Sequence, residues 1–143
     1  GCDHVINYSD TNVADAVRDL TGGAGVHAVF DAVGRDTFEA SLDSLADLGH
    51  LVSYGAASGD VTGIDPILFM HKGSIHFTRA SLRHYTNERS ELEAGAEALF
   101  GLIADGTIRV KINRFHGLEE MAAAHRALES RQLTGSGVVT LGD

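Results

Sequence analysis

Short runs of β-favouring residues alternate along this chain with segments whose apolar residues recur every three or four positions. The runs predict strands at residues 4–8, 26–33, 50–54, 74–79, 108–115 and 138–141. The run at 26–33 is nearly all apolar, which is typical of a parallel strand covered on both faces. Because parallel strands are joined by crossover helices, the alternation predicts an α/β fold with a mostly parallel sheet flanked by helices.

Polar residues and glycines indicate where the intervening helices begin and end. Ser9–Asp10 is expected to cap the first helix, and the pairs Asp36/Glu39 and Ser90/Glu93 have the spacing of capping boxes. The glycine-rich segment Thr21–Gly25 follows a helix and precedes a strand. A phosphate-binding loop has the opposite order, so this segment is interpreted as a helix stop.

Composition excludes several classes of function. The 143 residues carry 11 basic and 20 acidic side chains, a net charge of −9 that disfavours nucleic-acid binding. No apolar run reaches the roughly 18 residues that a membrane span needs. With one cysteine and no segment typical of a signal peptide, the expected compartment is the cytoplasm.

Three turns are candidates for ligand binding, because ligands of open α/β sheets bind beyond the carboxyl ends of the strands. They lie at residues 32–34, 55–59 and 78–81, and their small residues would let a ligand approach the backbone closely. The glycines in them are equally explained as ordinary loop residues, so both interpretations stay open.

Catalytic and metal-binding patterns are absent from the sequence. No nucleophile–base pair is recognised, and none of the eight histidines has the spacing of a metal ligand. Asp31, at the end of an apolar run, is either a general base or a turn-forming carboxylate, and the second interpretation is favoured. His125 lies on the apolar face of a helix expected at 118–128 and is expected to be buried and hydrogen-bonded.

Several segments, taken in order, have a familiar pattern. They are 3–8 (DHVINY), 29–34 (VFDAVG), 51–55 (LVSYG), 72–79 (KGSIHFTR), 124–131 (AHRALESR) and 134–135 (TG). Together they resemble the C-terminal part of the NADPH:quinone oxidoreductases, the zeta-crystallin-like branch of the medium-chain dehydrogenase/reductase superfamily. The resemblance implies a zinc-free enzyme that passes a hydride from NADPH to a quinone or another electron-poor alkene or carbonyl.

The resemblance also implies a domain organisation. Residues 1–108 would be the C-terminal part of a Rossmann domain, a partial Rossmann fold that lacks its first two strands and the glycine-rich pyrophosphate turn. Residues 109–143 would form a strand-helix-strand segment that returns to a GroES-like domain, which is absent from this chain. A sheet without two central strands exposes apolar edges, so the chain is expected to oligomerise. Relatives pair the edge strand Ser74–Arg79 across a homodimer, which makes this edge the first candidate interface.

The same resemblance assigns cofactor-binding residues by position. Tyr8 and Arg131 match residues near the adenosine 2′-phosphate, although Tyr8 could instead pack at a strand end and Arg131 could be a solvated helix terminus. The positions that match the lining of the dinucleotide and the loop near the nicotinamide are Val33, Gly34, Tyr54, Gly55, Ala56, Thr78 and Arg79. Ala56 and Ala80 stand where many relatives have Asn and Pro, which weakens the expected contacts at the nicotinamide end. No catalytic or metal-binding residue is assigned.

Three functions are therefore compared. The first is the C-terminal piece of an NADPH-dependent quinone or enone reductase, inactive by itself. The second is a non-catalytic dinucleotide-binding module, and the third is an assembly module with a vestigial pocket. The first is favoured, because the chain is expected to begin within a domain.

Overall fold

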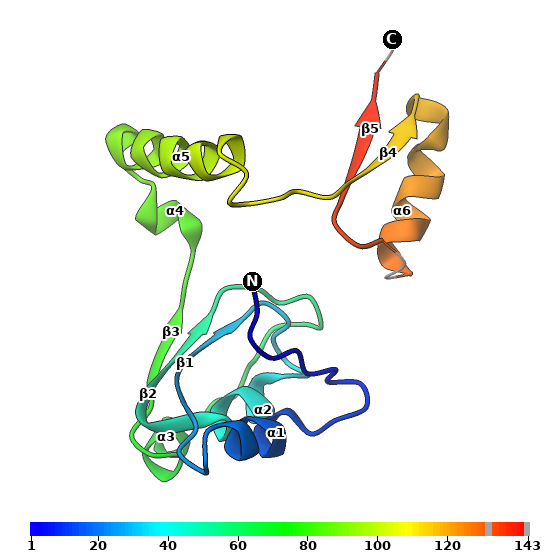
Figure 1. Ribbon diagram of the computed structural model, residues 1–143. Coiled ribbons are helices and arrows are strands. Elements are labelled where there is room, and N and C mark those ends of the chain that lie inside the picture. The colour runs from blue at the N-terminus through cyan, green and yellow to red at the C-terminus, as the bar shows by residue number, and fades with distance from the viewer. Residues whose placement is uncertain (131–132, 142–143) are drawn as a thin grey trace. The chain divides into compact units, whose positions relative to one another are not determined.

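A computed structural model describes residues 1–130 and 133–141. The chain divides into two compact units, residues 1–85 and 86–143, which are described separately (Figure 1). The proposed boundary between residues 108 and 109, which comes from the resemblance, stays a prediction. Within the described residues, no helix is both long and apolar enough to cross a bilayer.

The first unit is built on a parallel sheet with the strand order β1-β2-β3 (Figure 1). Its elements are α1 (Val13–Leu20), β1 (Val26–Asp31), α2 (Phe38–Asp43), β2 (Leu45–Ser53), α3 (Ile67–His71), β3 (His76–Arg79) and α4 (Leu82–Tyr85). The predicted α/β fold with parallel strands and flanking helices is confirmed.

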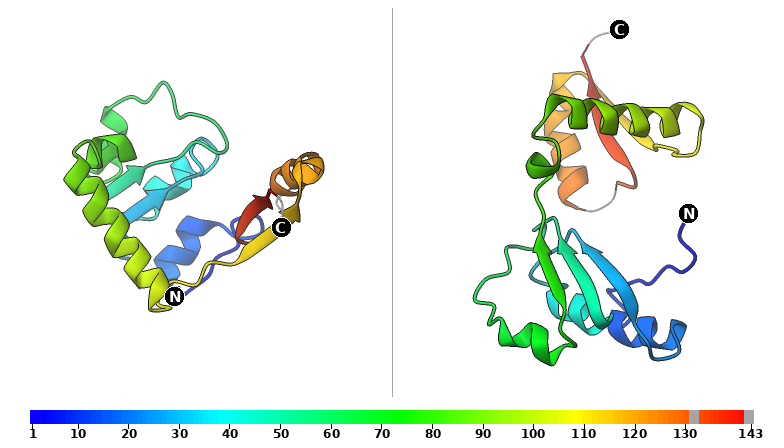
Figure 2. Two further views of the ribbon diagram at one scale, coloured as in Figure 1. Left: turned by 90° about the horizontal axis from the view of Figure 1, so that it is seen from above. Right: turned by 90° about the vertical axis from the view of Figure 1, so that its left-hand side faces the viewer.

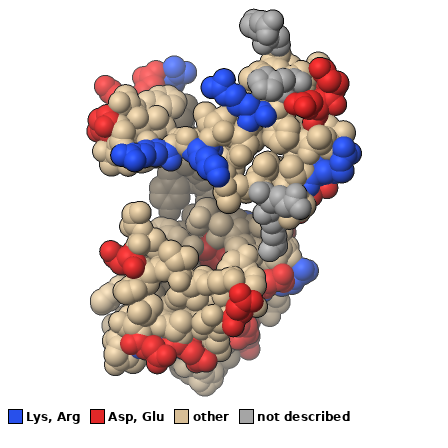
Figure 3. Space-filling model, turned by 45° about the vertical axis from the view of Figure 1, so that its right-hand side comes forward, with Lys and Arg blue, Asp and Glu red and all other residues tan. Residues whose placement is uncertain are grey.

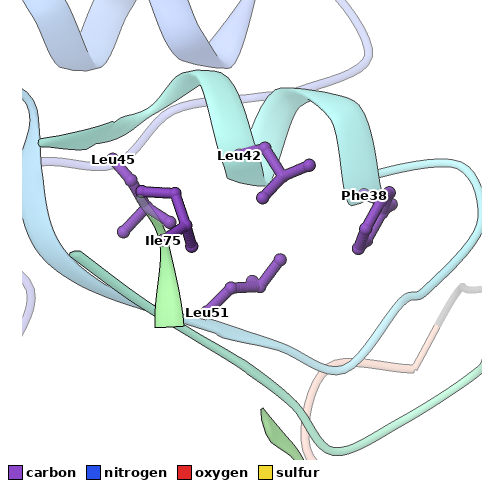
Figure 4. Packing of buried hydrophobic residues seen from close by; sticks show 5 residues of the cluster. All are labelled: Phe38, Leu42, Leu45, Leu51 and Ile75. Carbon is purple, nitrogen blue, oxygen red and sulfur yellow. The ribbon is translucent and has the colours of Figure 1, made fainter. Parts of the chain in front are cut away.

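The core of this unit lies between helix α2 and one face of the sheet (Figure 4). Its buried apolar residues are Phe38, Leu42, Leu45, Leu51 and Ile75. Phe77 of β3 extends the core, because its ring lies edge-on to Phe38 and stacks on Phe69 of α3. Close packing of these few side chains is the main source of the unit's hydrophobic stabilisation.

The opposite face of the sheet is open in the described chain, which corrects the expectation that the strand at 26–33 is covered on both faces. Phe30 is 70% exposed, and Ala28 beside it is exposed as well. The next strands present their own exposed residues to this face, because Ala28 pairs with His50 and His50 with His76. The helical layer therefore covers one side of β1 only.

The prediction of a first strand at residues 4–8 is wrong. Residues 1–12 contain no regular helix or strand, and Val5 is 85% exposed. A parallel strand needs a neighbour to satisfy its backbone N–H and C=O groups. Among the described residues, the only strand hydrogen-bonded to β1 is β2, so the segment has no partner strand.

The expected helix caps are also corrected. Helix α1 is capped by Asn12 and not by Ser9 or Asp10, since the Asn12 Oδ1 atom accepts hydrogen bonds from the N–H groups of residues 14 and 15. Helix α2 begins after Thr37, and the Thr37 hydroxyl donates to Asp31 instead of capping the helix. The helix stop after α1 is confirmed by positive φ angles of 62° and 89° at residues 22 and 23.

Arg18 fixes α1 to the rest of the first unit. Its guanidinium donates to the carbonyl oxygens of Gly23 (2.9 Å), Asp43 (3.1 Å) and Leu45 (2.7 Å). These carbonyls belong to the loop before β1, the end of α2 and the start of β2. One side chain thus satisfies three backbone acceptors that would otherwise need water.

The second unit contains a long helix and a strand-helix-strand motif (Figure 2). Its elements are α5 (Arg89–Ala104), β4 (Ile112–His116), the 3-10 turn η1 (Leu118–Glu120), α6 (Met121–Glu129) and β5 (Ser136–Thr140). Strands β4 and β5 are parallel, so the predicted strand-helix-strand segment is confirmed.

Two expectations about side chains in the second unit are wrong. Helix α5 begins at Arg89, after Glu88, and Ser90 makes no capping hydrogen bond. Arg89 instead pairs with Glu93 one turn along the helix, so the acidic residue of the expected capping box is used in an ion pair. His125 is exposed on α6 and not buried.

Candidate functional site

The carboxyl ends of the three strands of the first unit lie side by side. Asp31 of β1 is in register with Ser53 of β2, and Ser53 is in register with Arg79 of β3. The turns that follow these strands therefore gather at one edge of the sheet, where open α/β sheets bind their ligands. The three candidate turns of the sequence are brought together here.

Asp31 organises the turn after β1. Its carboxylate accepts hydrogen bonds from the N–H groups of Val33 (2.8 Å) and Gly34 (3.0 Å), and from the hydroxyls of Thr37 (2.8 Å) and Ser41 (2.8 Å). Burial acts to raise the pKa of Asp31, but these hydrogen bonds outweigh it and lower the pKa below its usual value. A carboxylate held ionised by four donors is a structural group, so the turn-forming interpretation is confirmed.

The turns after β1 and β2 are bound to each other through their backbones. Ser58 donates from its N–H to the carbonyl of Val33 (2.8 Å), and Arg35 donates from its N–H to the carbonyl of Gly59 (3.0 Å). Tyr54 donates from its N–H to the carbonyl of Asp31 (2.9 Å). The two turns therefore form one rigid platform at the end of the sheet.

Gly34 and Gly55 are required by this close approach. A Cβ atom on Gly34, whose φ is +93°, would lie 2.6 Å from the carbonyl oxygen of Gly59. A Cβ atom on Gly55 would lie 2.2 Å from the carbonyl oxygen of Ala32. Contact between the two turns thus accounts for both glycines without a ligand, and the ordinary-loop interpretation is sufficient for them.

A hollow of about 300 Å³ opens beside the first of these turns. Its lining residues are Ile6, Tyr8, Val13, Phe30, Asp31, Ala32, Val33, Thr37 and Ser41. Tyr8 is 51% exposed and borders the same space as Val33, although the two are far apart in sequence. The hollow is mostly apolar, and Asp31, its one charged lining residue, is already fully hydrogen-bonded.

A second hollow, of about 340 Å³, lies at the ends of β2 and β3. It is lined by Ser53, Gly55, Asp60, Val61, Thr62, Ile64, Phe77 and Arg79. Arg79 is held there by donating to the carbonyls of Ser53 (3.1 Å) and Ala80 (3.4 Å). Asp60 puts a second charge in the hollow, and only its place just after the glycine turn at 55–59 could have indicated this from the sequence.

Thr78 and Arg79 cannot serve one ligand in the same way, because consecutive residues of a strand point to opposite faces. Arg79 faces the second hollow, whereas Thr78 is paired with Val52 on the open face of the sheet. Tyr54 and Ala56 lie in the platform between the strand ends. Arg131 lies outside the described residues.

Among the residues that the structure describes, no group of three His, Cys, Asp or Glu side chains could hold a metal ion. The buried carboxylate of Asp31 and the exposed histidines therefore form no three-ligand centre there.

Comparison with known proteins gives the family. The model of the family described as zinc-binding dehydrogenase matches residues 1–139. The chain belongs to this family. It is 46% identical over 139 residues to a quinone oxidoreductase of Pseudomonas aeruginosa, covering 97% of this chain and 43% of that protein. It is 41% identical over 140 residues to a 2-haloacrylate reductase of a Burkholderia species, covering 95% of this chain and 41% of that protein.

A crystal structure of Escherichia coli quinone oxidoreductase complexed with NADPH has the same fold over 97% of this chain and 43% of that chain, with a TM-score of 0.91 and 41% identity. The chain thus spans about two-fifths of the length of the relatives it matches. The expected partial Rossmann fold agrees with the likeness, because the chain corresponds to the C-terminal Rossmann-like part of such structures.

Proposed function

We propose that this chain is the C-terminal part of an NADPH-dependent oxidoreductase that delivers hydride to a quinone or a related electron-poor alkene or carbonyl. The observation that carries the proposal is the platform at the carboxyl ends of β1 and β2, with the Tyr8 hollow beside it. Relatives named for quinone and for haloacrylate reduction support the class of acceptor. The NADPH complex of the E. coli relative supports the cofactor.

The residues of the platform fit part of NADPH. The Tyr8 hollow, at about 300 Å³, has an apolar floor and an exposed phenol, which suit a ribose or a ring better than a whole dinucleotide. Its lining contains no cation, and the hydroxyls of Thr37 and Ser41 already donate to Asp31, so among the lining hydroxyls that of Tyr8 is left to contact a phosphate. Arg131, which lies outside the described residues, stays a proposed phosphate ligand on the strength of the family resemblance, because a guanidinium binds phosphate through paired hydrogen bonds.

The other cofactor contacts are proposed along the same edge. Val33, Gly34, Gly55 and Ala56 present backbone and small side chains along which a dinucleotide can lie. The side chain of Tyr54 is exposed beside them, and its backbone N–H fixes the turn. Thr78 and Arg79 are proposed for the nicotinamide end, each serving a different face of the sheet.

Hydride transfer is proposed to need the rest of the enzyme. When bound, the nicotinamide supplies the hydride, and the protein's task is to hold the acceptor against it in the right orientation. No catalytic residue is proposed within this chain, which spans about two-fifths of its relatives. We therefore propose that the chain binds the cofactor weakly and does not turn it over.

The binding proposal is tested by titrating NADPH and NADH into the isotopically labelled chain and following its amide resonances by NMR. The expected result is a set of shifts at the proposed contact residues 8, 33–34, 54–56, 78–79 and 131, larger for NADPH than for NADH. Tyr8→Phe removes only the hydroxyl and should reduce the difference between the cofactors. Tyr85→Phe, at an exposed tyrosine of α4 that lines neither hollow at the strand ends, is the matched control.

Equal responses to the two cofactors would reject the 2′-phosphate assignment, and no response would favour an assembly module. Quinone-dependent oxidation of NADPH by these 143 residues alone would refute the proposed inactivity.

We further propose that the chain forms a homodimer through the edge Ser74–Arg79. Strand β3 is at one end of the order β1-β2-β3 and leaves a row of backbone groups available for a second copy. In a Cys2→Ser background, Thr78→Cys is expected to cross-link between copies with a short bismaleimide. Phe30→Cys, on the other edge strand, is the control and should cross-link less. Monomeric light scattering at micromolar concentration would contradict the proposal.

A further inference from the structure

Two histidines lie directly opposite each other on the open face of the first unit's sheet. His50 of β2 is in register with His76 of β3. Their rings are stacked, with centroids 4.5 Å apart and planes inclined by 12°. Both residues are exposed, so neither ring is needed to fill the core.

We propose that His50 and His76 form a two-ligand chelate for a late first-row divalent cation such as Ni²⁺, Cu²⁺ or Zn²⁺. Neutral imidazole nitrogen is a preferred ligand of these ions. Two nitrogens at adjacent coordination positions, each about 2.1 Å from the metal, lie about 3 Å apart. Centroids 4.5 Å apart are close enough for this separation, but the rings are nearly parallel, so each must turn out of the stack before both nitrogens point at one ion. Exposure leaves both rings free to turn.

The backbone sets up this pair before any metal binds. The two residues are held by the parallel pairing of β2 with β3, which continues for three further residue pairs to Ser53 and Arg79. A chelate whose ligands are already adjacent gains over two separate histidines, because the second ligand binds at a high effective concentration. Strand pairing thus holds the two ligands next to each other before the metal binds, and only the orientations of the rings must change.

The pair is separate from the proposed cofactor platform. His50 and His76 are the first residue pair of the β2–β3 register, whereas Ser53 and Arg79 at the platform are the last. Three residues of strand correspond to about 10 Å. Loss of metal binding and loss of cofactor binding are therefore separable by mutation.

Two histidines leave the rest of the coordination sphere to water. Within the described residues, no third His, Cys, Asp or Glu completes a metal-binding group. The open coordination positions predict an exchangeable ion, with an affinity below that of a structural zinc site. Because the ion bridges two strands, it should stabilise the folded chain over the unfolded one.

The test uses the 143-residue chain without a histidine tag and with Cys2→Ser, because the exposed Cys2 thiol would itself bind a soft metal. Ni²⁺ is titrated by calorimetry, and its paramagnetic broadening of amide resonances is mapped by NMR. The expected result is one site, with broadening centred on residues 50 and 76. His50→Ala and His76→Ala should each weaken Ni²⁺ at least about tenfold, and the double variant should lose little more.

His84→Ala removes an exposed histidine of α4 and is the matched control, which should leave Ni²⁺ affinity unchanged. Ni²⁺ should also raise the Tm of the parent and of His84→Ala, but not that of either pair variant. Circular dichroism of each variant without metal checks that it is folded. Broadening spread over all the histidines, or equal small losses from every single variant, would overturn the proposal.

Discussion

The two units share a parallel strand-helix-strand motif but differ in what they bury. The first unit adds a third strand and further helices to this motif, and it buries five apolar side chains. In the second unit, no described side chain is buried. A middle strand with neighbours on both edges is what lets Leu51 reach complete burial, whereas each strand of a two-stranded sheet is an edge.

Apolar content does not explain this difference. Helix α5 contains Leu92, Leu99 and Phe100, yet all three are exposed. A core needs apolar faces from at least two layers of secondary structure that pack on each other. The number of packed layers, and not the hydrophobicity of the segments, therefore separates the two units.

Substitution at the centre of the first unit should lower the free energy of unfolding the most. Leu51→Ala removes a side chain with no exposed surface and should lower the free energy of unfolding by about 3–4 kcal/mol. Leu99→Ala on α5 should cost less than about 1 kcal/mol. Urea unfolding, followed by hydrogen exchange that resolves the two units, measures both. Equal losses would mean that the second unit has a core of its own.

A smaller loss in the free energy of unfolding is expected at Asp31, whose pKa is lowered in the folded chain. A carboxyl group whose pKa is lower in the folded chain than in the unfolded chain stabilises the fold at pH values above its unfolded pKa, which is near 4. This stabilisation is lost as the pH falls through the folded pKa. Asp31→Asn should therefore cost about 2 kcal/mol at pH 7, and the difference from the parent should shrink below pH 4. Denaturation at pH 7, 4 and 3 tests this.

Asp105 in the second unit provides the contrast. Its pKa is also lowered, by the N–H and the side chain of Thr107, but this carboxylate is fully exposed. Asp105→Asn should change the stability much less than Asp31→Asn at every pH. If the loss of stability caused by Asp105→Asn depended on pH as strongly as that caused by Asp31→Asn, the link between burial of the carboxylate and its contribution to stability would be contradicted.

Still smaller losses in the free energy of unfolding are expected when two arginines in different settings are replaced. Arg18→Met leaves the carbonyls of Gly23, Asp43 and Leu45 without their donor and should cost about 1–2 kcal/mol. Arg89→Met breaks an exposed ion pair with Glu93 and should cost less than about 0.5 kcal/mol. Thermal unfolding in low and high salt separates them, because only the exposed pair is screened.

The smallest expected effect is a gain in stability. Leu48 is 64% exposed and has a φ of 60°, a left-handed conformation that costs a branched residue about 1 kcal/mol. Leu48→Gly should therefore raise the free energy of unfolding by about 0.5–1 kcal/mol. Leu128→Gly, equally exposed but inside α6, should lower it by about 1 kcal/mol. A loss at both positions would contradict the strain at Leu48.

Periodicity predicted α1 and, from β1 onward, the order of the strands and of the helices other than α4, because these segments are long enough to show an apolar face. The four residues of α4 are too few for such a pattern. Periodicity could not show that the segment 4–8 lacks a partner strand, since pairing depends on residues distant in sequence. It also misplaced the caps, because the Thr37 hydroxyl is used by Asp31 and Glu93 by Arg89. Local spacing cannot reveal such competition.

The strand-end site, like the fold, could be predicted in part from the sequence. The three candidate turns do meet, because parallel strands place their carboxyl ends together. The approach of Tyr8 to Val33 came only from the family resemblance, and the charge of Asp60 in the second hollow was missed. The stacking of His50 on His76 depends on strand register, which no spacing rule for metal ligands covers.

Every strand pairing among the described residues is parallel, and this has a kinetic consequence. Each pairing joins residues far apart in sequence, from Val26 with Leu45, the nearest, to Ala28 with His50 or Ile112 with Ser136. No pair can zip up from a tight hairpin, so chain closure over long loops must precede the first stabilising contacts. Newly made chains should therefore pass slowly through states with unpaired strand edges, and the yield of soluble protein should depend on how crowded those nascent chains are.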